Sequence, residues 1–191
     1  LACDTTCPYC AGALLSGDAG ITQTVEEMKK GQAERLMLIL EELAKLHGLA
    51  YADLDALAVG TGPGNFTGIR IGVSAARGLA LGLGIPAYGV NGFEQRAILD
   101  PSEIVHSIAA PRGQRYVRDA SGAALISAEA FESKGYTIPT DPTPDALVAS
   151  IALAARARFP NPTLTPAPYS LQAPDACPLL THHPAHRHTA H

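Results

Sequence analysis

A glycine-rich segment from Gly60 to Gly68 carries the residues best suited to chemistry in this sequence. It follows a short apolar run and precedes a stretch of small residues that is typical of a helix. Glycines allow a positive φ and a close backbone approach, and the free N–H groups at a helix start favour an anion. We therefore expect a phosphate or nucleotide contact, in a complex only, at Gly62, Pro63, Gly64, Asn65, Thr67 and Gly68.

The same spacing also fits a tight strand-to-helix turn that holds no ligand. The Gly-Lys-Ser/Thr ending of a phosphate-binding P-loop does not follow the segment. The segment is not the GxGxxG of dinucleotide-binding proteins, and no acidic residue stands about twenty residues further on. From the spacing alone, both interpretations stay open.

Asp4 lies at the end of the first expected strand. There it either caps a turn or faces a metal–phosphate site, and the second role makes an ATPase or phosphotransferase the alternative function. Glu41 and Glu42 point apart on a helix, and Glu41 with Lys45 forms an ordinary i,i+4 pair. Neither a Ser–His–Asp set nor a close carboxylate pair can be assigned, so we expect no catalytic residue.

Three of the four cysteines stand close together, at Cys3, Cys7 and Cys10, with the spacing C-x3-C-x2-C. An iron–sulfur cluster needs converging thiolates, whereas strand alternation is expected to point Cys3 and Cys10 to opposite faces. A zinc site needs a fourth ligand, which Cys177 or a histidine would have to supply. We expect no metal site and no cofactor bound by this chain alone, with these two sites as alternatives.

Alternating strands and helices predict an α/β fold in which the first part positions the glycine-rich segment. The patterns predict strands at 1–5, 10–16, 21–25, 56–59 and 87–90, with a loop at 26–32. Helices are expected at 33–47 and 69–83, and a further helix is expected to start near Gly92, where Asn91 and Glu94 resemble a capping box.

The two longer helices have features of a contact surface. Five consecutive apolar residues at 36–40 point all round a helix axis, which exceeds the single stripe that packing on a sheet requires. Gly72, Ala76 and Ala80 are spaced by four and form a slender face. We expect a subunit interface here, broken by Ala76→Trp or Leu40→Glu, with burial by the same chain as the alternative. The expected interface residues are Leu36, Met37, Leu40, Leu43, Arg70, Gly72, Val73, Ala76, Arg77 and Ala80.

The character of the chain changes after residue 99, where prolines divide it into shorter pieces. We expect a first lobe at 1–99, a smaller second lobe at 100–180 and a disordered histidine-rich tail at 181–191. The second lobe is expected to contain strands at 104–109, 116–118 and 123–126. A helix is expected from the N-cap Thr143 to about residue 159, packed on the second lobe's sheet.

Composition narrows the classes of function. The chain has 191 residues, a net charge of −4 and 17% charged residues, without the basic excess of a nucleic-acid-binding protein. We therefore expect any RNA to be held by a partner. Eighteen consecutive uncharged apolar residues are absent, and the start of the chain shows no secretion signal, so a cytoplasmic location without membrane contact is expected.

Several segments together resemble the TsaB (YeaZ) family, a sister of the TsaD/Kae1 proteins. Leu1-Ala-Cys-Asp-Thr-Thr is similar to the family's opening LAIDTAT. The stretch 53–72, DLDALAVGTGPGNFTGIRIG, resembles the central signature DIDAIAVGxGPGSFTGxRIG. The segment at 169–176 resembles a terminal YLRxPDA. The likeness is dense over 1–95 and patchy after residue 100.

This resemblance implies an actin-like (ASKHA, ribonuclease H-like) fold with two lobes, the second reduced. It implies a non-catalytic subunit in making N6-threonylcarbamoyladenosine on the tRNA adenosine next to the anticodon. A TsaD-like protein would perform the transfer and a TsaE-like protein would hydrolyse ATP with Mg²⁺. The chain would pair, through the two helices above, with the TsaD-like protein or with a second copy of itself, and tRNA would be reached only through the complex.

Departures from the family pattern fall at two places. The sister enzyme holds a metal with a His-x3-His pair on its first helix, whereas 32–40 here has no histidine and His47 stands alone. Relatives often have histidine where Gln32 stands. The family's DAR+GE+Y strand corresponds to 109–116, AAPRGQRY, which has lost the acidic positions. Metal-assisted transfer therefore cannot be placed on this chain.

Overall fold

A computed structural model describes residues 1–17, 20–161, 165–169 and 171 of the chain. Its larger sheet has the order β3-β2-β1-β4-β5. A meander starts it, since β1 pairs antiparallel with β2 and β2 with β3, whereas β4 runs parallel to both β1 and β5. The strands are β1 (Ala2–Asp4), β2 (Tyr9–Leu15), β3 (Ile21–Glu27), β4 (Leu57–Gly60) and β5 (Ala87–Val90).

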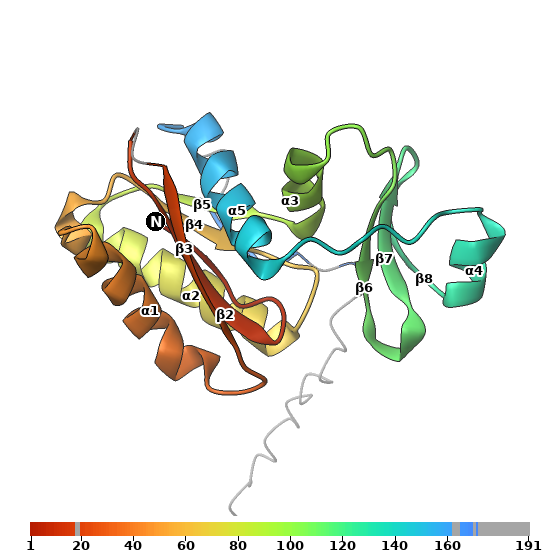
Figure 1. The fold of residues 1–191 in the computed structure, drawn as a ribbon, viewed down its shortest axis with the longest axis horizontal. Coiled ribbons are helices and arrows are strands. Elements are labelled where there is room, and N and C mark those ends of the chain that lie inside the picture. The colour runs from red at the N-terminus through yellow and green to blue at the C-terminus, as the bar shows by residue number, and fades with distance from the viewer. Residues whose placement is uncertain (18–19, 162–164, 170, 172–191) are drawn as a thin grey trace, which may run out of the picture.

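Helices cover both faces of this sheet (Figure 1). Helices α1 (Gln32–Leu46) and α2 (Phe66–Leu83) pack on one face, in a core with Cys3, Cys10 and Val59. Helix α5 (Pro144–Arg158) packs on the other face against residues of β1, β2, β4 and β5. The expectation that α5 lies on the second sheet was wrong. Its buried side chains, among them Val148 and Ile151, instead cover the alanine-rich side of the first sheet.

A smaller antiparallel sheet with the order β6-β7-β8 lies beyond α3 (Gly92–Leu99). Its strands are β6 (His106–Ala109), β7 (Arg115–Asp119) and β8 (Gly122–Ile126). Helix α4 (Ala128–Ser133), which the sequence analysis missed, starts at the N-cap Ser127 and buries Phe131. Two short 3-10 helices, η1 (Tyr51–Asp53) and η2 (Pro111–Gly113), lie in connections.

Most predicted elements are confirmed, with shifted ends. The capping box of Asn91 and Glu94 is formed, and Thr143 caps α5. Helix α2 starts three residues earlier than expected, because the side chain of Asn65 accepts a hydrogen bond from the N–H of Gly68. Strand β3 extends to Glu27, through part of the expected loop, because it pairs with β2 along its whole length.

The tail at 181–191 and Cys177 lie outside the described residues, as does most of the terminal motif. Among the helices that are described, none has the length and apolar character needed to cross a membrane.

Candidate functional site

The glycine-rich segment folds directly onto the turn between β1 and β2. The backbone N–H of Asn65 donates to the carbonyl oxygen of Thr6 (2.7 Å). The hydroxyl of Thr5 donates to the carbonyl oxygen of Gly68 (2.6 Å). Both threonines are buried. The segment is therefore anchored by the backbone and side chains of its own first lobe.

This packing accounts for the glycines. A Cβ atom at Gly64 would collide with the carbonyl oxygen of Thr6, and one at Gly68 would collide with that of Thr5. A Cβ at Gly60 would stand 2.6 Å from Asp4 Oδ1. The chain's own carbonyl and carboxylate oxygens thus occupy the space into which a Cβ would project at these three glycines. A phosphate or nucleotide contact of this segment in a complex stays a prediction.

Asp4 is fully buried in the first lobe. Its carboxylate accepts hydrogen bonds from the N–H of Thr6 and the hydroxyl of Tyr9, each at 2.9 Å, and none of its surface is exposed. Burial raises the pKa of Asp4, while those hydrogen bonds and the positive charge of Arg96 lower it in part. In this conformation the carboxylate holds the β1–β2 turn and is not open to a substrate.

The pH dependence of stability is expected to reveal this burial. Because the folded pKa of Asp4 lies above that of an unfolded aspartate, the Asp4 contribution is present at low pH and is lost as pH rises through the folded pKa. Asp4→Asn removes that loss. In urea titrations, the free energy of unfolding of the variant, relative to the parent chain, should therefore increase as pH rises above about 4, the ordinary pKa of aspartate. A difference that stays flat or decreases would contradict the raised pKa.

The cysteines do not form a metal site in the described part of the chain. The expectation that Cys3 and Cys10 point to opposite faces was wrong, because they lie on neighbouring strands and both enter the core under α1 and α2. Burial raises the pKa of Cys3 to about 12 and that of Cys10 to about 11, which favours the protonated thiols. Among the described residues, three or more His, Cys, Asp or Glu side chains do not converge anywhere.

Gln32 and His47 have structural partners at the two ends of α1. The side-chain nitrogen of Gln32 donates to the carbonyl oxygens of Cys7 (2.9 Å) and Tyr9 (3.1 Å). At the other end, His47 Nε2 lies 2.9 Å from the hydroxyl of Thr22 on β3. Each side chain thus ties α1 to the first sheet, and Gln32 also holds the turn that precedes β2.

Most of the expected interface residues are buried inside this chain. Gly72 faces the sheet, where a Cβ would lie 2.7 Å from the Thr5 hydroxyl oxygen and 3.2 Å from Val59. The buried set is Leu36, Leu40, Leu43, Gly72, Val73, Ala76 and Ala80, whereas Met37, Arg70 and Arg77 reach the surface. The slender stripe of α2 therefore packs on its own sheet, which is the alternative that the sequence left open.

A different stripe of α2 is exposed. Its residues lie on one side of the helix, and we call them the outer face of α2: Phe66, Arg70, Ser74, Arg77, Gly78, Leu81 and Gly82. Leu81 is 86% exposed, and a Cβ at Gly78 or Gly82 would meet nothing within 4 Å. The guanidinium of Arg70 lies 3.9 Å from the centre of the Phe66 ring. On α1, Leu38 is 50% exposed.

Comparison with known proteins gives a family match over most of the chain. The family described as "TsaD: tRNA N6-adenosine threonylcarbamoyltransferase" matches residues 24–165. The chain is 37% identical over 91 residues to the tRNA threonylcarbamoyladenosine biosynthesis protein TsaB of Escherichia coli (strain K12), which covers 48% of this chain and 39% of that protein. It is 52% identical over 62 residues to the tRNA N6-adenosine threonylcarbamoyltransferase of Jannaschia sp. (strain CCS1), covering 32% of this chain and 17% of that protein.

The matched region thus spans about two-fifths of the length of the E. coli TsaB relative. Among solved structures, the chain is similar to an uncharacterized protein from Pseudomonas aeruginosa that itself has similarity to peptidase YeaZ. That likeness has a TM-score of 0.70 at 24% identity and covers 90% of this chain and 98% of the other. YeaZ from the same organism gives a TM-score of 0.62. These likenesses confirm the expected α/β fold of the actin-like class.

Proposed function

This chain belongs to the TsaD family of tRNA N6-adenosine threonylcarbamoyltransferases and is similar to its TsaB (YeaZ) members. On that premise we propose that it is a non-catalytic partner subunit in the threonylcarbamoyladenosine modification of tRNA. It binds and activates a TsaD-type transferase and carries no active site of its own.

The observation that carries this proposal is the outer face of α2. Leu81 is almost fully solvent-exposed, and the neighbouring Gly78 and Gly82 leave space for the backbone of another helix to come close. A large apolar side chain beside small residues favours close packing against a partner, because it loses water contact and gains van der Waals contact there. Arg70 and Arg77 belong to the same outer face of α2 and supply positive charges for the rim of the contact.

The candidate catalytic groups support the same proposal. Asp4 is buried and hydrogen-bonded, and Gln32 binds backbone carbonyls at the start of α1. The glycine-rich segment packs against the β1–β2 turn and is hydrogen-bonded to it. Chemistry therefore falls to other subunits. ATP and Mg²⁺ are handled by the TsaD-type transferase and a TsaE-type ATPase, the tRNA is held by the complex, and the same helix face also permits a homodimer.

Sedimentation velocity tests the proposal directly. The chain, titrated with the TsaD-type transferase of the same organism, is expected to form a faster-sedimenting one-to-one complex. An unrelated enzyme whose net charge is similar to that of the transferase, such as glutamine synthetase, replaces the transferase in the control. This enzyme and the chain should sediment independently of each other. If chain and transferase also sediment independently at every ratio, the proposed partner is wrong.

A further inference from the structure

Strand β3 is the outermost strand of the larger sheet, so one side of it has no strand partner in the part of the chain that the structure describes. It pairs with β2 in one continuous register, from Ile21 opposite Leu15 to Glu27 opposite Tyr9, without a bulge. Native edge strands are often protected by a bulge, a proline or a lysine. The strand, ITQTVEE, contains none of these protections and is therefore open to pairing with another strand.

The register determines which backbone groups of β3 face outward. In an antiparallel pair, residues of hydrogen-bonded pairs point both backbone groups at the partner strand, and the residues between them point both groups away. At the two ends of the ladder, the carbonyl oxygen of Gly20 accepts from the N–H of Ser16 (3.1 Å), and the N–H of Met28 donates to Pro8 (3.0 Å). The even-numbered residues of β3 thus bond to β2. The outward N–H and C=O groups belong to Ile21, Gln23, Val25 and Glu27.

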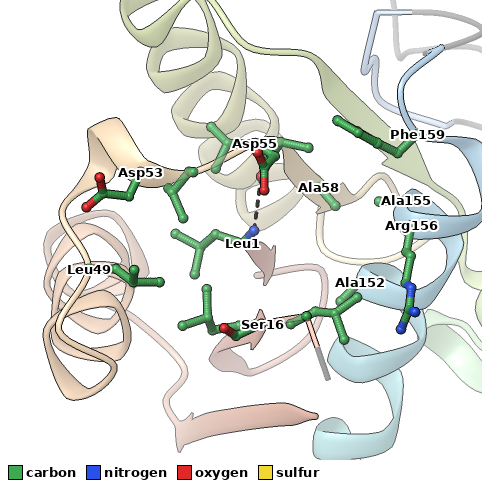
Figure 2. Close-up of a pocket in the computed structure, with 16 residues that line it drawn as sticks. Leu1, Ser16, Leu49, Asp53, Asp55, Ala58, Ala152, Ala155, Arg156 and Phe159 are labelled. Atoms are coloured by element: carbon green, nitrogen blue, oxygen red, sulfur yellow. Dashed lines mark hydrogen bonds between the residues drawn. The ribbon is translucent and has the colours of Figure 1, made fainter. Parts of the chain in front are cut away.

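The helices leave this edge of the sheet accessible. Helix α1 lies over β2, because a Cβ at Gly12 would meet the side chains of Ile39 and Leu43. On the other face, Ala155 of α5 lies next to Ala58 of β4, further inside the sheet (Figure 2). A further strand can therefore add to β3 without displacing a helix.

The side chains of β3 leave apolar surface and little uncompensated charge at this edge. Ile21 and Val25 pack against the core under α5 but stay only half-buried. They retain apolar surface that a neighbouring strand would remove from water. On the α1 face, Arg35 forms an ion pair with Glu26, which offsets the charge of this carboxylate.

We propose that β3 pairs antiparallel with β3 of a second copy of this chain, with Gln23 on the two-fold axis. Both outward backbone groups of Gln23 then bond to those of Gln23 in the other copy, and those of Ile21 bond to those of Val25. Two five-stranded sheets thereby join into one continuous sheet. This contact is separate from the outer face of α2, so it goes beyond the proposed function.

The sequence of β3 is complementary to itself in this register. On the α5 face, Ile21 of each copy lies opposite Val25 of the other, and the two Gln23 side chains face each other with amide donors and acceptors. On the α1 face, Thr22 lies opposite Thr24. Such β-branched and threonine pairs favour antiparallel pairing. The two carboxylates of the strand lie beyond these pairs, so like charges do not meet.

A shift of the two-fold axis by one residue, to Thr24, loses this complementarity. Ile21 would then lie opposite Glu27, and Gln23 would lie opposite Val25, so that each apolar side chain meets a charged or polar one. The register centred on Gln23 is therefore favoured over this one. The match of the strand with itself is the reason for a second copy as the occupant of the edge.

Sedimentation equilibrium tests the association. The 191-residue chain carries Leu81→Glu, so that the outer face of α2 does not contribute. We expect a monomer–dimer equilibrium with a dissociation constant of about 100 µM. Gln23→Lys places two ammonium groups opposite each other and should raise this constant at least about tenfold. Ser133→Lys adds the same charge at an exposed position of α4 and should leave the constant unchanged.

Cysteine crosslinking tests the register. In a background with Cys7→Ser and Cys177→Ser, Gln23→Cys brings two thiols together across the axis, where the Cα atoms of a hydrogen-bonded pair lie about 5.5 Å apart. Oxidation with copper phenanthroline is expected to give a disulfide-linked dimer. Glu27→Cys, on the same edge and face, is the matched control. Its two copies would lie about 27 Å apart and should not link.

Any of three results overturns the proposal. The chain stays monomeric up to about 1 mM, Gln23→Lys dimerises as strongly as Ser133→Lys, or Glu27→Cys links as readily as Gln23→Cys. Because the side chain of Gln23 is exposed, circular dichroism should show folded variants. If Gln23→Lys is unfolded, Gln23→Glu replaces it and places two carboxylates at the axis. Binding of the TsaD-type transferase is measured separately, so failure here leaves the proposed function untouched.

Discussion

Gly68→Ala is expected to lower the free energy of unfolding by about 2–4 kcal/mol. The new methyl group would collide with the carbonyl oxygen of Thr5, which belongs to the backbone of a buried turn and cannot rotate away. Moving α2 outward would also break the hydrogen bond from the Thr5 hydroxyl to Gly68. The effect should therefore exceed the usual gain from alanine in a helix, which is about 1 kcal/mol.

Gly78→Ala on the same helix is the matched control. No heavy atom lies within 4 Å of a Cβ at this position, so only helix propensity changes. This variant should be more stable than the parent chain by about 0.5–1 kcal/mol. Urea titrations of both variants measure the two effects. If both substitutions stabilise the chain, the packing of α2 on the β1–β2 turn is not as the structure has it.

Leu81→Glu is expected to weaken association with the TsaD-type transferase by about 10- to 100-fold, or about 1.4–2.8 kcal/mol. The charged side chain would have to be desolvated at the contact, whereas the free chain tolerates it because Leu81 is exposed. Thermal unfolding should be almost unchanged. Sedimentation titrations give the dissociation constants.

Ile104→Glu provides the control for that experiment. Ile104 is 82% exposed and lies before β6, away from α2, so its replacement should leave the affinity unchanged. Equal affinity of the Leu81→Glu variant and the parent chain would show that the outer face of α2 is not the contact. The sequence first suggested Ala76→Trp and Leu40→Glu. These substitutions would test folding instead, because Ala76 on α2 and Leu40 on α1 are both buried in the core between these helices and the sheet.

Local signals predicted the elements of the first lobe well. Asn91 and Glu94 marked the start of α3, and the apolar run before the glycine-rich segment marked β4. These features depend on neighbouring residues, which sequence shows directly. The side of the sheet that α5 covers depends on packing between distant segments, and the mostly apolar Ala/Leu pattern of α5 did not specify it.

The exposed side of α2 shows a similar limit. Two small-residue stripes with a spacing of four occur on this helix, one at 72, 76 and 80 and one at 74, 78 and 82. Spacing alone does not decide which stripe meets the sheet. Arg70 and Arg77 were the available signal, because arginines rarely face a core and both lie on the side of Ser74 and Gly78.

The glycines of the segment at 60–68 were interpreted as a sign of a bound ligand. A ligand and a segment of the chain's own backbone can each come this close only where the residue has no Cβ, so the sequence does not distinguish them. Only the structure shows that Thr5 and Thr6 fill that space. Sequence therefore predicted the close approach at Gly64 and Gly68 but not the group that makes it.

Formation of threonylcarbamoyladenosine on tRNA tests the central claim most directly. The TsaD-type transferase, TsaE-type ATPase, ATP, threonylcarbamoyl donor and tRNA are incubated with and without this chain, and the modified nucleoside is quantified by mass spectrometry. The account predicts modification only when the chain is present, with a large loss for Leu81→Glu and none for Ile104→Glu. Equal modification with and without the chain would contradict its role as an activating partner.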